Sequence, residues 1–138
     1  MRIVIDTNVI VSGIFFGGRP GDLLQLVLTR QVEAIATSQI LAEYQATIHC
    51  LLKRYGGTHL HFSMLPLFTA MEVIPQTESI KICRDPDDDK FISCAVDGRC
   101  IYIVSGDKDL LSLGQYGDVE ILTVTQFFEK YKEIENNG

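Results

Sequence analysis

The stretch that decides the fold is MRIVIDTNVIVSG, residues 1–13. Its apolar run Arg2–Ile5 predicts a strand, but Asp6, Thr7 and Asn8 follow directly, and apolar residues then resume. A single polar residue here would indicate a turn, whereas three in a row are typical of the rim of a site. Asp6 also suits a helix N-cap, and Thr7 and Asn8 fit capping as well as they fit orienting an acid.

Strand-like and helix-like segments alternate along the rest of the chain. Strands are predicted at 2–5, 32–36, 72–74, 100–104 and 119–124, and helices at 21–29, 39–54, 59–71, 86–97 and 107–113. The helix at 59–71 is the weakest because Pro66 interrupts it. Apolar runs such as 101–104 are typical of strands covered on both faces. We therefore expect an open, mostly parallel α/β sheet with sites beyond the carboxyl ends of its strands.

Composition and charge limit the possible classes of function. The 138 residues are 46% hydrophobic and 22% charged, which predicts one domain at 1–130 followed by a polar, frayed tail at 131–138. No apolar stretch reaches the roughly 18 residues of a membrane span, and Asp6 interrupts any secretory signal, so we expect a cytoplasmic protein. The net charge of −6 argues against bulk attraction of nucleic acid. It does not exclude a nuclease whose acids are neutralised by metal ions.

Cysteine and histidine spacing argues against zinc and against nucleophile–histidine chemistry. No two cysteines stand at two-residue spacing, so we expect small, reduced core residues. The four are Cys50, Cys83, Cys94 and Cys100. The histidines, at positions 49, 59 and 61, lie outside the acid-rich segments and are expected at the surface or in packing.

The most informative acidic segment is RDPDDDKFISCAV, residues 84–96. Asp85 before Pro86 predicts a helix N-cap with proline at the first helical position, and the next two acids suit the positive end of the helix dipole. Asp89 differs because its helical row contains Ile92 and Val96, so its carboxylate is expected to point to the buried side. A buried carboxylate needs a partner, which is either a backbone amide, a base or a metal.

A single site in which four acids meet would explain why each of them is present. If the strand ends and two helices meet, Asp6, Glu43, Asp89 and Asp107 come close to one another. The local alternatives are a solvated helix flank for Glu43 and a helix cap for Asp107. Two carboxylates about 4 Å apart repel by roughly 4 kcal/mol at an effective dielectric near 20, so a cluster raises its pKa values or binds a cation. Oxygen ligands suit Mg²⁺ or Mn²⁺ better than Zn²⁺.

Four motifs in this order resemble those of a PIN domain: VIDTNVIVSG (4–13), SQILAEY (38–44), RDPDDDKFISCA (84–95) and IVSGDKDLL (103–111). The resemblance runs from Met1 to about Thr125 and is nearest to small bacterial and archaeal PIN proteins described as toxins of toxin–antitoxin pairs. It implies a three-layer α/β/α sandwich around a mostly parallel sheet. It also implies metal-dependent cleavage of RNA, which leaves a 5′-phosphate and a 3′-hydroxyl.

The resemblance further implies which residues form the site. Divalent metal, Mg²⁺ or Mn²⁺, is held by acids, and neighbouring hydroxyl and amide groups support them. The acids are Asp6, Glu43, Asp89 and Asp107, with Asp109 as a further ligand, and the supporting residues are Thr7, Asn8 and Ser105. The distance in sequence to the segment FISCA (residues 91–95) selects Asp89 as the ligand. An alignment shifted by one residue would select Asp88 instead. Glu43 is expected to help orient the attacking water.

The implied partners are RNA, a small basic antitoxin and a second copy of the chain. Arg19, Lys90 and Lys108 are the bases nearest the acids in sequence and the candidates for contacts to the RNA backbone. The apolar residues at 62–68 suit either a homodimer interface or core packing. The alternatives are a binding module with weak catalysis and a housekeeping RNA-processing nuclease. A phosphoacceptor domain and an Asp-x-Asp phosphatase fit less well, because Asn8 stands where the second acid of the phosphatase motif would be.

Overall fold

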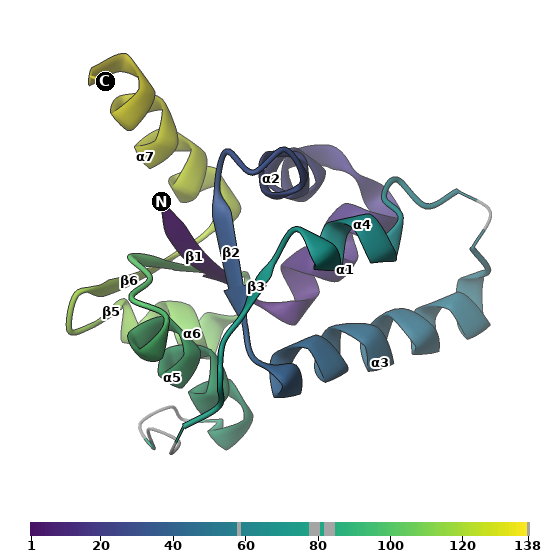
Figure 1. Cartoon of the computed structure of the whole chain (residues 1–138), viewed down its shortest axis with the longest axis horizontal. Coiled ribbons are helices and arrows are strands. Elements are labelled where there is room, and N and C mark those ends of the chain that lie inside the picture. Colours follow the sequence, from purple (N-terminus) through teal and green to yellow (C-terminus); the bar gives the residue numbers. More distant parts are fainter. Residues whose placement is uncertain (58, 78–80, 82–84, 138) are drawn as a thin grey trace.

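A six-stranded sheet forms the centre of the computed structural model, which describes residues 1–57, 59–77, 81 and 85–137 (Figure 1). The strand order is β3-β2-β1-β4-β6-β5. Every pairing is parallel except the antiparallel one between β5 and β6. The strands are β1 (Arg2–Ile5), β2 (Glu33–Ala36), β3 (Glu72–Val73), β4 (Tyr102–Val104), β5 (Gln115–Tyr116) and β6 (Val119–Leu122). The predicted mostly parallel sheet is therefore confirmed.

Helices cover both faces of this sheet, which gives the expected three layers (Figure 1). On one face α5 packs against β1, β2 and β4, and on the other α1 packs against α2 and α3. The helices are α1 (Thr7–Phe16), α2 (Gly18–Leu28), α3 (Ser38–Tyr55), α4 (Met64–Thr69), the 3-10 turn η1 (Pro86–Asp88), α5 (Asp89–Asp97), α6 (Lys108–Leu113) and α7 (Val124–Asn137). Within the described ranges, none of them has both the length and the apolar character needed to cross a membrane.

The helix α1 is absent from the sequence prediction. Its β-branched residues and Gly13 give the segment a low intrinsic helix propensity. Burial outweighs that propensity, because Ile10 and Ile14 are completely enclosed. Gly13 lets α2 approach closely, since a Cβ at this position would lie 2.6 Å from Cδ1 of Leu24. Tertiary packing therefore decides the conformation of this segment.

The C-terminal segment corrects two further expectations. The last strand ends at Leu122, and the segment predicted as a frayed tail at 131–138 continues α7 as far as Asn137. The helix is attached to the body through Phe127, which is fully buried and meets Tyr102 edge to face with ring centroids 6.2 Å apart. Tyr131 stacks on Phe127 at 5.8 Å, so the start of the predicted tail takes part in packing.

The segment predicted as a helix at 59–71 and the cysteines differ in part from expectation. Only α4 is helical there, and Pro66 lies in its first turn, where a missing N–H is tolerated. Leu67 is fully buried while Leu65 is 79% exposed, so this segment contributes both to the core and to the surface. The described cysteines are free: Cys94 and Cys100 are buried as predicted, Cys50 is exposed, and Cys83 lies outside the described residues.

The sheet order brings the ends of β1 and β4 side by side. Ile5 pairs with Val104 in parallel register, and the backbone N–H of Asp6 donates to the Val104 carbonyl at 2.9 Å. The residues after each strand, Asp6 and Ser105, therefore stand next to each other although they are far apart in sequence. This edge is where the sequence predicts a site.

Candidate active site

Asp6 turns its carboxylate toward Ser105 instead of capping α1. It occupies the N-cap position but makes no side-chain cap hydrogen bond. Ser105 Oγ donates to Asp6 Oδ2 at 2.7 Å and accepts a hydrogen bond from the backbone N–H of Asp107 at 2.9 Å. Both side chains are buried, Ser105 completely. Asp6 is therefore the predicted N-cap residue but without a side-chain capping hydrogen bond, and the Ser105 hydroxyl fixes the orientation of this acid.

The environment of Asp6 disfavours its charge. Burial is the largest cause and raises the pKa of the carboxyl, and the nearby acids Asp107 and Glu43 raise it further. The hydrogen bond from Ser105 opposes this shift because it stabilises the carboxylate. Glu43 of α3 and Asp107 at the start of α6 therefore both act electrostatically on Asp6, which follows β1.

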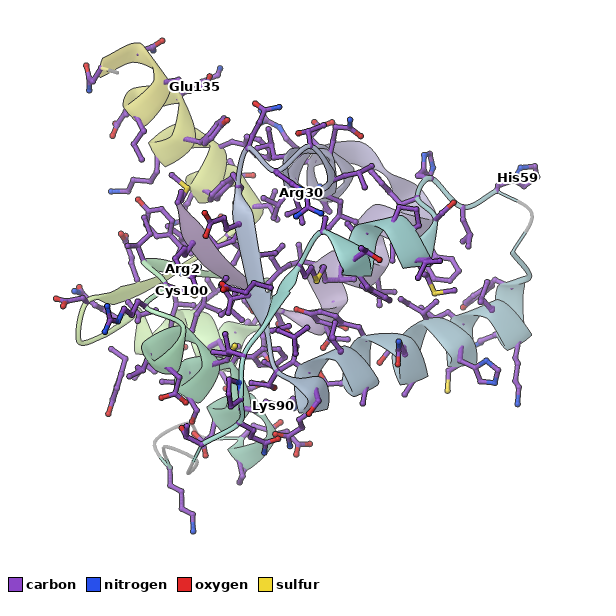
Figure 2. The ribbon with its side chains drawn as sticks, viewed as in Figure 1. Arg2, Arg30, His59, Lys90, Cys100 and Glu135 are labelled. Atoms are coloured by element: carbon purple, nitrogen blue, oxygen red, sulfur yellow. The ribbon has the colours of Figure 1, made fainter. Side chains whose placement is uncertain are left out.

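Glu43 reaches this edge from α3 and is held by two partners. Thr7 Oγ1 donates to Glu43 Oε2, and Lys90 Nζ lies 2.7 Å from Glu43 Oε1. Figure 2 shows Lys90 where α5 meets the beginning of α3. The hydroxyl of Tyr44, the next residue on α3, donates to the carbonyl of Ile5 and so ties α3 to the end of β1. Glu43 is therefore part of the site and not a solvated flank.

Asp88 joins the site from the turn η1, which begins at the N-cap Asp85 and Pro86. It is 7% exposed, and its Oδ2 is the buried side-chain oxygen without a hydrogen-bond partner in the part of the chain that the structure describes. Burial first, then the charges of Asp107 and Asp6, raise the pKa of Asp88 to about 7, and Lys90 opposes that shift. Asp88 thus faces the acids at the ends of β1 and β4.

Asp89, which the sequence analysis selected, is also buried, at 6% exposure on the first turn of α5. The sequence also contains the helical spacing of apolar residues that points to Asp88. Phe91 and Ile92, three and four residues after Asp88, are both completely buried, whereas Val96 in the row of Asp89 is 42% exposed. The ligand role of Asp89 stays a prediction, and Asp88 is added to the candidate set.

Asp107 has the capping role that the sequence left open and lies at the site as well. Its Oδ1 accepts a hydrogen bond from the backbone N–H of Asp109 at 2.8 Å at the start of α6, while its charge acts on Asp6 and Asp88. Asp109 is half-buried in the first turn of α6. Asn8 is exposed on the first turn of α1, at the rim of this edge.

The acids are neighbours without forming a closed metal cage. Among the residues described, no three Asp, Glu, His or Cys side chains are grouped tightly enough to hold a metal ion as they stand. The donor set is nonetheless the oxygen-rich one that Mg²⁺ and Mn²⁺ prefer. The partnerless oxygen of Asp88 beside Asp6 and Asp107 fits such an ion, because a cation would supply the interaction that this buried carboxylate lacks.

Comparison with known proteins places this arrangement in a family. The chain is 36% identical over 118 residues to the uncharacterized protein MJ1680 of Methanocaldococcus jannaschii, an overlap of 82% of this chain and 75% of that protein. A chain in the crystal structure of VapBC2 from Rickettsia felis, bound to a DNA fragment from their promoter, shares the fold with a TM-score of 0.59 and 16% identity, over 88% of this chain and 97% of that one. Residues 2–109 match the PIN domain family, whose members are generally nucleases. The chain belongs to the PIN domain family.

Proposed function

We propose that the chain is a divalent-metal-dependent endoribonuclease that hydrolyses RNA phosphodiester bonds and acts as the toxin of a toxin–antitoxin pair. The observation that carries the proposal is the buried, partnerless oxygen of Asp88 beside Asp6 and Asp107. Three acids in this arrangement call for a cation, and family membership supports the use of that cation in nucleic-acid hydrolysis.

The side chains have separate roles in this proposal. Asp6, Asp88 and Asp107 hold Mg²⁺ or Mn²⁺, with Glu43, Asp89 and Asp109 as further candidate ligands. When bound, the ion lowers the pKa of a bound water and stabilises the charge that develops on the scissile phosphate. Ser105 keeps Asp6 in one orientation through its hydrogen bond. Thr7 holds Glu43, which orients the attacking water, and exposed Asn8 contacts the substrate at the rim.

A small basic antitoxin is the proposed protein partner. The neighbour of similar fold is a chain of a VapBC2 complex, and the net charge of −6 favours a basic partner. The surface offers an apolar cavity of about 500 Å³ between the ends of α1 and α3, next to Phe16 and Tyr55. These side chains are 76% and 67% exposed, and large exposed apolar groups mark protein contacts. In copurification with candidate small basic proteins, Phe16→Ser with Tyr55→Ser should abolish binding of the partner that wild type retains, whereas Val73→Ser, at another exposed apolar position, should not.

Cleavage of labelled single-stranded RNA tests the nuclease. Wild type, Asp6→Asn, Asp88→Asn and the control Asp118→Asn, an exposed acid away from the site, are compared in EDTA, Mg²⁺ and Mn²⁺. We expect metal-dependent cutting by wild type and Asp118→Asn, with 5′-phosphate and 3′-hydroxyl ends, and a loss of at least about 100-fold in the two site variants, because oriented charge at the reacting centre contributes most to such catalysis. Undiminished cutting by Asp88→Asn would show that the site is misplaced. Absence of cutting by folded wild type with several RNAs would favour the binding-module alternative.

A further inference from the structure

Lys90 is a cation held inside the acid cluster. Its Nζ lies 2.7 Å from Glu43 Oε1 and donates to the carbonyl of Asp87 at 2.6 Å. The same ammonium lies 5.0 Å from the centre of the Phe91 ring. Only 11% of the Lys90 side chain is exposed, so the ion pair is largely shielded from water. A lysine on a solvated helix face would have none of these constraints.

Both oxygens of Glu43 are engaged in the structure. Lys90 holds Oε1, and the Thr7 hydroxyl donates to Oε2. A metal ion can therefore be ligated by Glu43 only if one of these partners is exchanged. This engagement is consistent with the acids being close together without forming a ready-made cage among the described residues.

We propose that Lys90 is a positioning residue that acts as a resident counter-ion: it holds Glu43 in the metal-free protein and releases it when a divalent cation binds. The inference rests on the proposed metal-dependent function. Release leaves the ammonium with two stabilising contacts, the Asp87 carbonyl and the Phe91 ring, while the lost ion pair opposes metal binding. Lys90 thereby weakens the affinity for the metal and neutralises the charge of Glu43 in its absence.

Titration calorimetry with Mn²⁺ alone, without RNA, tests this role. We expect Lys90→Met to bind Mn²⁺ about tenfold more tightly than wild type, because Glu43 no longer has to give up a shielded ion pair. Methionine is unbranched and of similar length but carries no charge. Lys90→Arg keeps the charge and should bind like wild type. Lys108→Met removes an exposed positive charge next to Asp107 and controls for net charge, so its affinity should change by less than about twofold.

A double-mutant cycle shows whether Lys90 acts through Glu43. In a Glu43→Gln background, Lys90→Met should leave the Mn²⁺ affinity unchanged. Equal tightening by Lys108→Met and Lys90→Met, tightening that persists without Glu43, or weaker binding by Lys90→Met would each overturn the inference while leaving the metal-dependent function in place. Absence of Mn²⁺ binding by every folded variant, wild type included, would overturn both.

Melting temperatures in EDTA provide a second readout. Lys90→Met should melt below wild type without metal, because Glu43 loses its counter-ion, and the difference should shrink or reverse at saturating Mn²⁺. A deficit of the same size with and without Mn²⁺ would assign Lys90 a structural role alone and overturn the inference.

Discussion

A single hydroxyl holds the two strand ends of the site together. Ser105 is completely buried, donates to the Asp6 carboxylate and accepts from the Asp107 backbone. The Asp6 carboxylate and the Asp107 backbone N–H, which are far apart in the sequence, thus share one small side chain, that of Ser105. A substitution that removes only the oxygen would leave both groups without their partner, and a buried group without a partner destabilises more than the net value of one hydrogen bond.

Ser105→Ala should therefore lower the free energy of unfolding by about 2 kcal/mol. Urea denaturation followed by circular dichroism measures the loss. Ser112→Ala, at an exposed position of α6, is the matched control, because its hydroxyl donates to the carbonyl of Lys108 one turn earlier. We expect that control to change stability by less than about 0.5 kcal/mol. Similar losses in the two variants would contradict the role assigned to Ser105.

The raised pKa of Asp88 predicts a specific pH dependence of stability. Its folded pKa is about 7 against an ordinary 3.8, so the folded state keeps a proton that the unfolded state releases. The stabilisation is present below about pH 4 and is lost as the pH rises through about 7. In EDTA, the free energy of unfolding of wild type should fall by about 2 kcal/mol relative to that of Asp88→Asn between these two pH values. This is less than the pKa shift alone would give, because solvent screens part of the site. Urea denaturation at several pH values measures it, and parallel curves for the two proteins would contradict the assignment.

Individual residues differ in how far the sequence determined them. Asp6 and Asp107 were predictable because Asp6 directly follows an apolar strand and Asp107 stands three residues after the end of another, and parallel strands place such residues on one edge. The choice between Asp88 and Asp89 stayed open by one position, since four acids and a proline leave the start of a helix uncertain by about one residue. The contact of Lys90 with Glu43 joins α5 to α3, and no local pattern specifies which base meets which acid.

Among the elements, apolar strands and amphipathic helices such as α3 were predictable, and so were the short β3 and α6, whereas β5, α1 and α7 were missed. The antiparallel strand β5 has two residues and carries no periodic signal. In α1 the propensities oppose the observed helix. In α7 the aromatic residues 127, 128 and 131 provide a clear apolar stripe, but the polar residues beyond them suggested fraying. The stripe packs around Phe127, and Arg19 of α2 lies 5.3 Å from the Phe128 ring centre.

This packing makes α7 a structural element with one principal anchor. Phe127→Ala should lower the free energy of unfolding by about 3 to 4 kcal/mol, because it empties a buried aromatic position in contact with Tyr102. Ile134→Ala, on the same helix and 48% exposed, should change it by less than about 0.5 kcal/mol. Thermal or urea unfolding separates the two. A small effect of Phe127→Ala would mean that α7 is dispensable for the fold.

Across the whole molecule, charged groups gather at both ends of the parallel strands. Those at the carboxyl ends form the candidate site, and those at the amino ends form ion pairs. At the edge opposite the candidate site, Arg2 pairs with Glu33 at 2.8 Å and Glu72 at 2.6 Å and donates to the Gly98 carbonyl at 2.7 Å. These contacts of Arg2 link the first residues of β1, β2 and β3 to the C-terminal end of α5. Figure 2 shows Arg2 beside Cys100, whose pKa burial raises to about 12, so that the thiol stays neutral.

Substitution of Arg2 separates stability from activity. Arg2→Met should lower the free energy of unfolding by about 1 kcal/mol, since partly exposed ion pairs contribute little. Mn²⁺ affinity and RNA cleavage should stay at wild-type levels, because the sheet separates Arg2 from the carboxyl edge. Titration calorimetry with the folded variant checks the Mn²⁺ affinity, and the cleavage assay checks the activity on RNA. A loss of metal binding here would show that the two edges are coupled.

The pairing of β1 with β4 also determines when the site can exist during synthesis. Of the two neighbours of β1, β2 follows α2, but β4 is made only after α1 through α5, so the pairing of β1 with β4 is strongly non-local. A nascent chain that ends at α5 already carries Asp6, Glu43 and Asp88, yet it lacks Ser105 and Asp107, which complete the edge. The candidate site is therefore incomplete on the nascent chain until β4 and the turn after it have emerged and packed against β1.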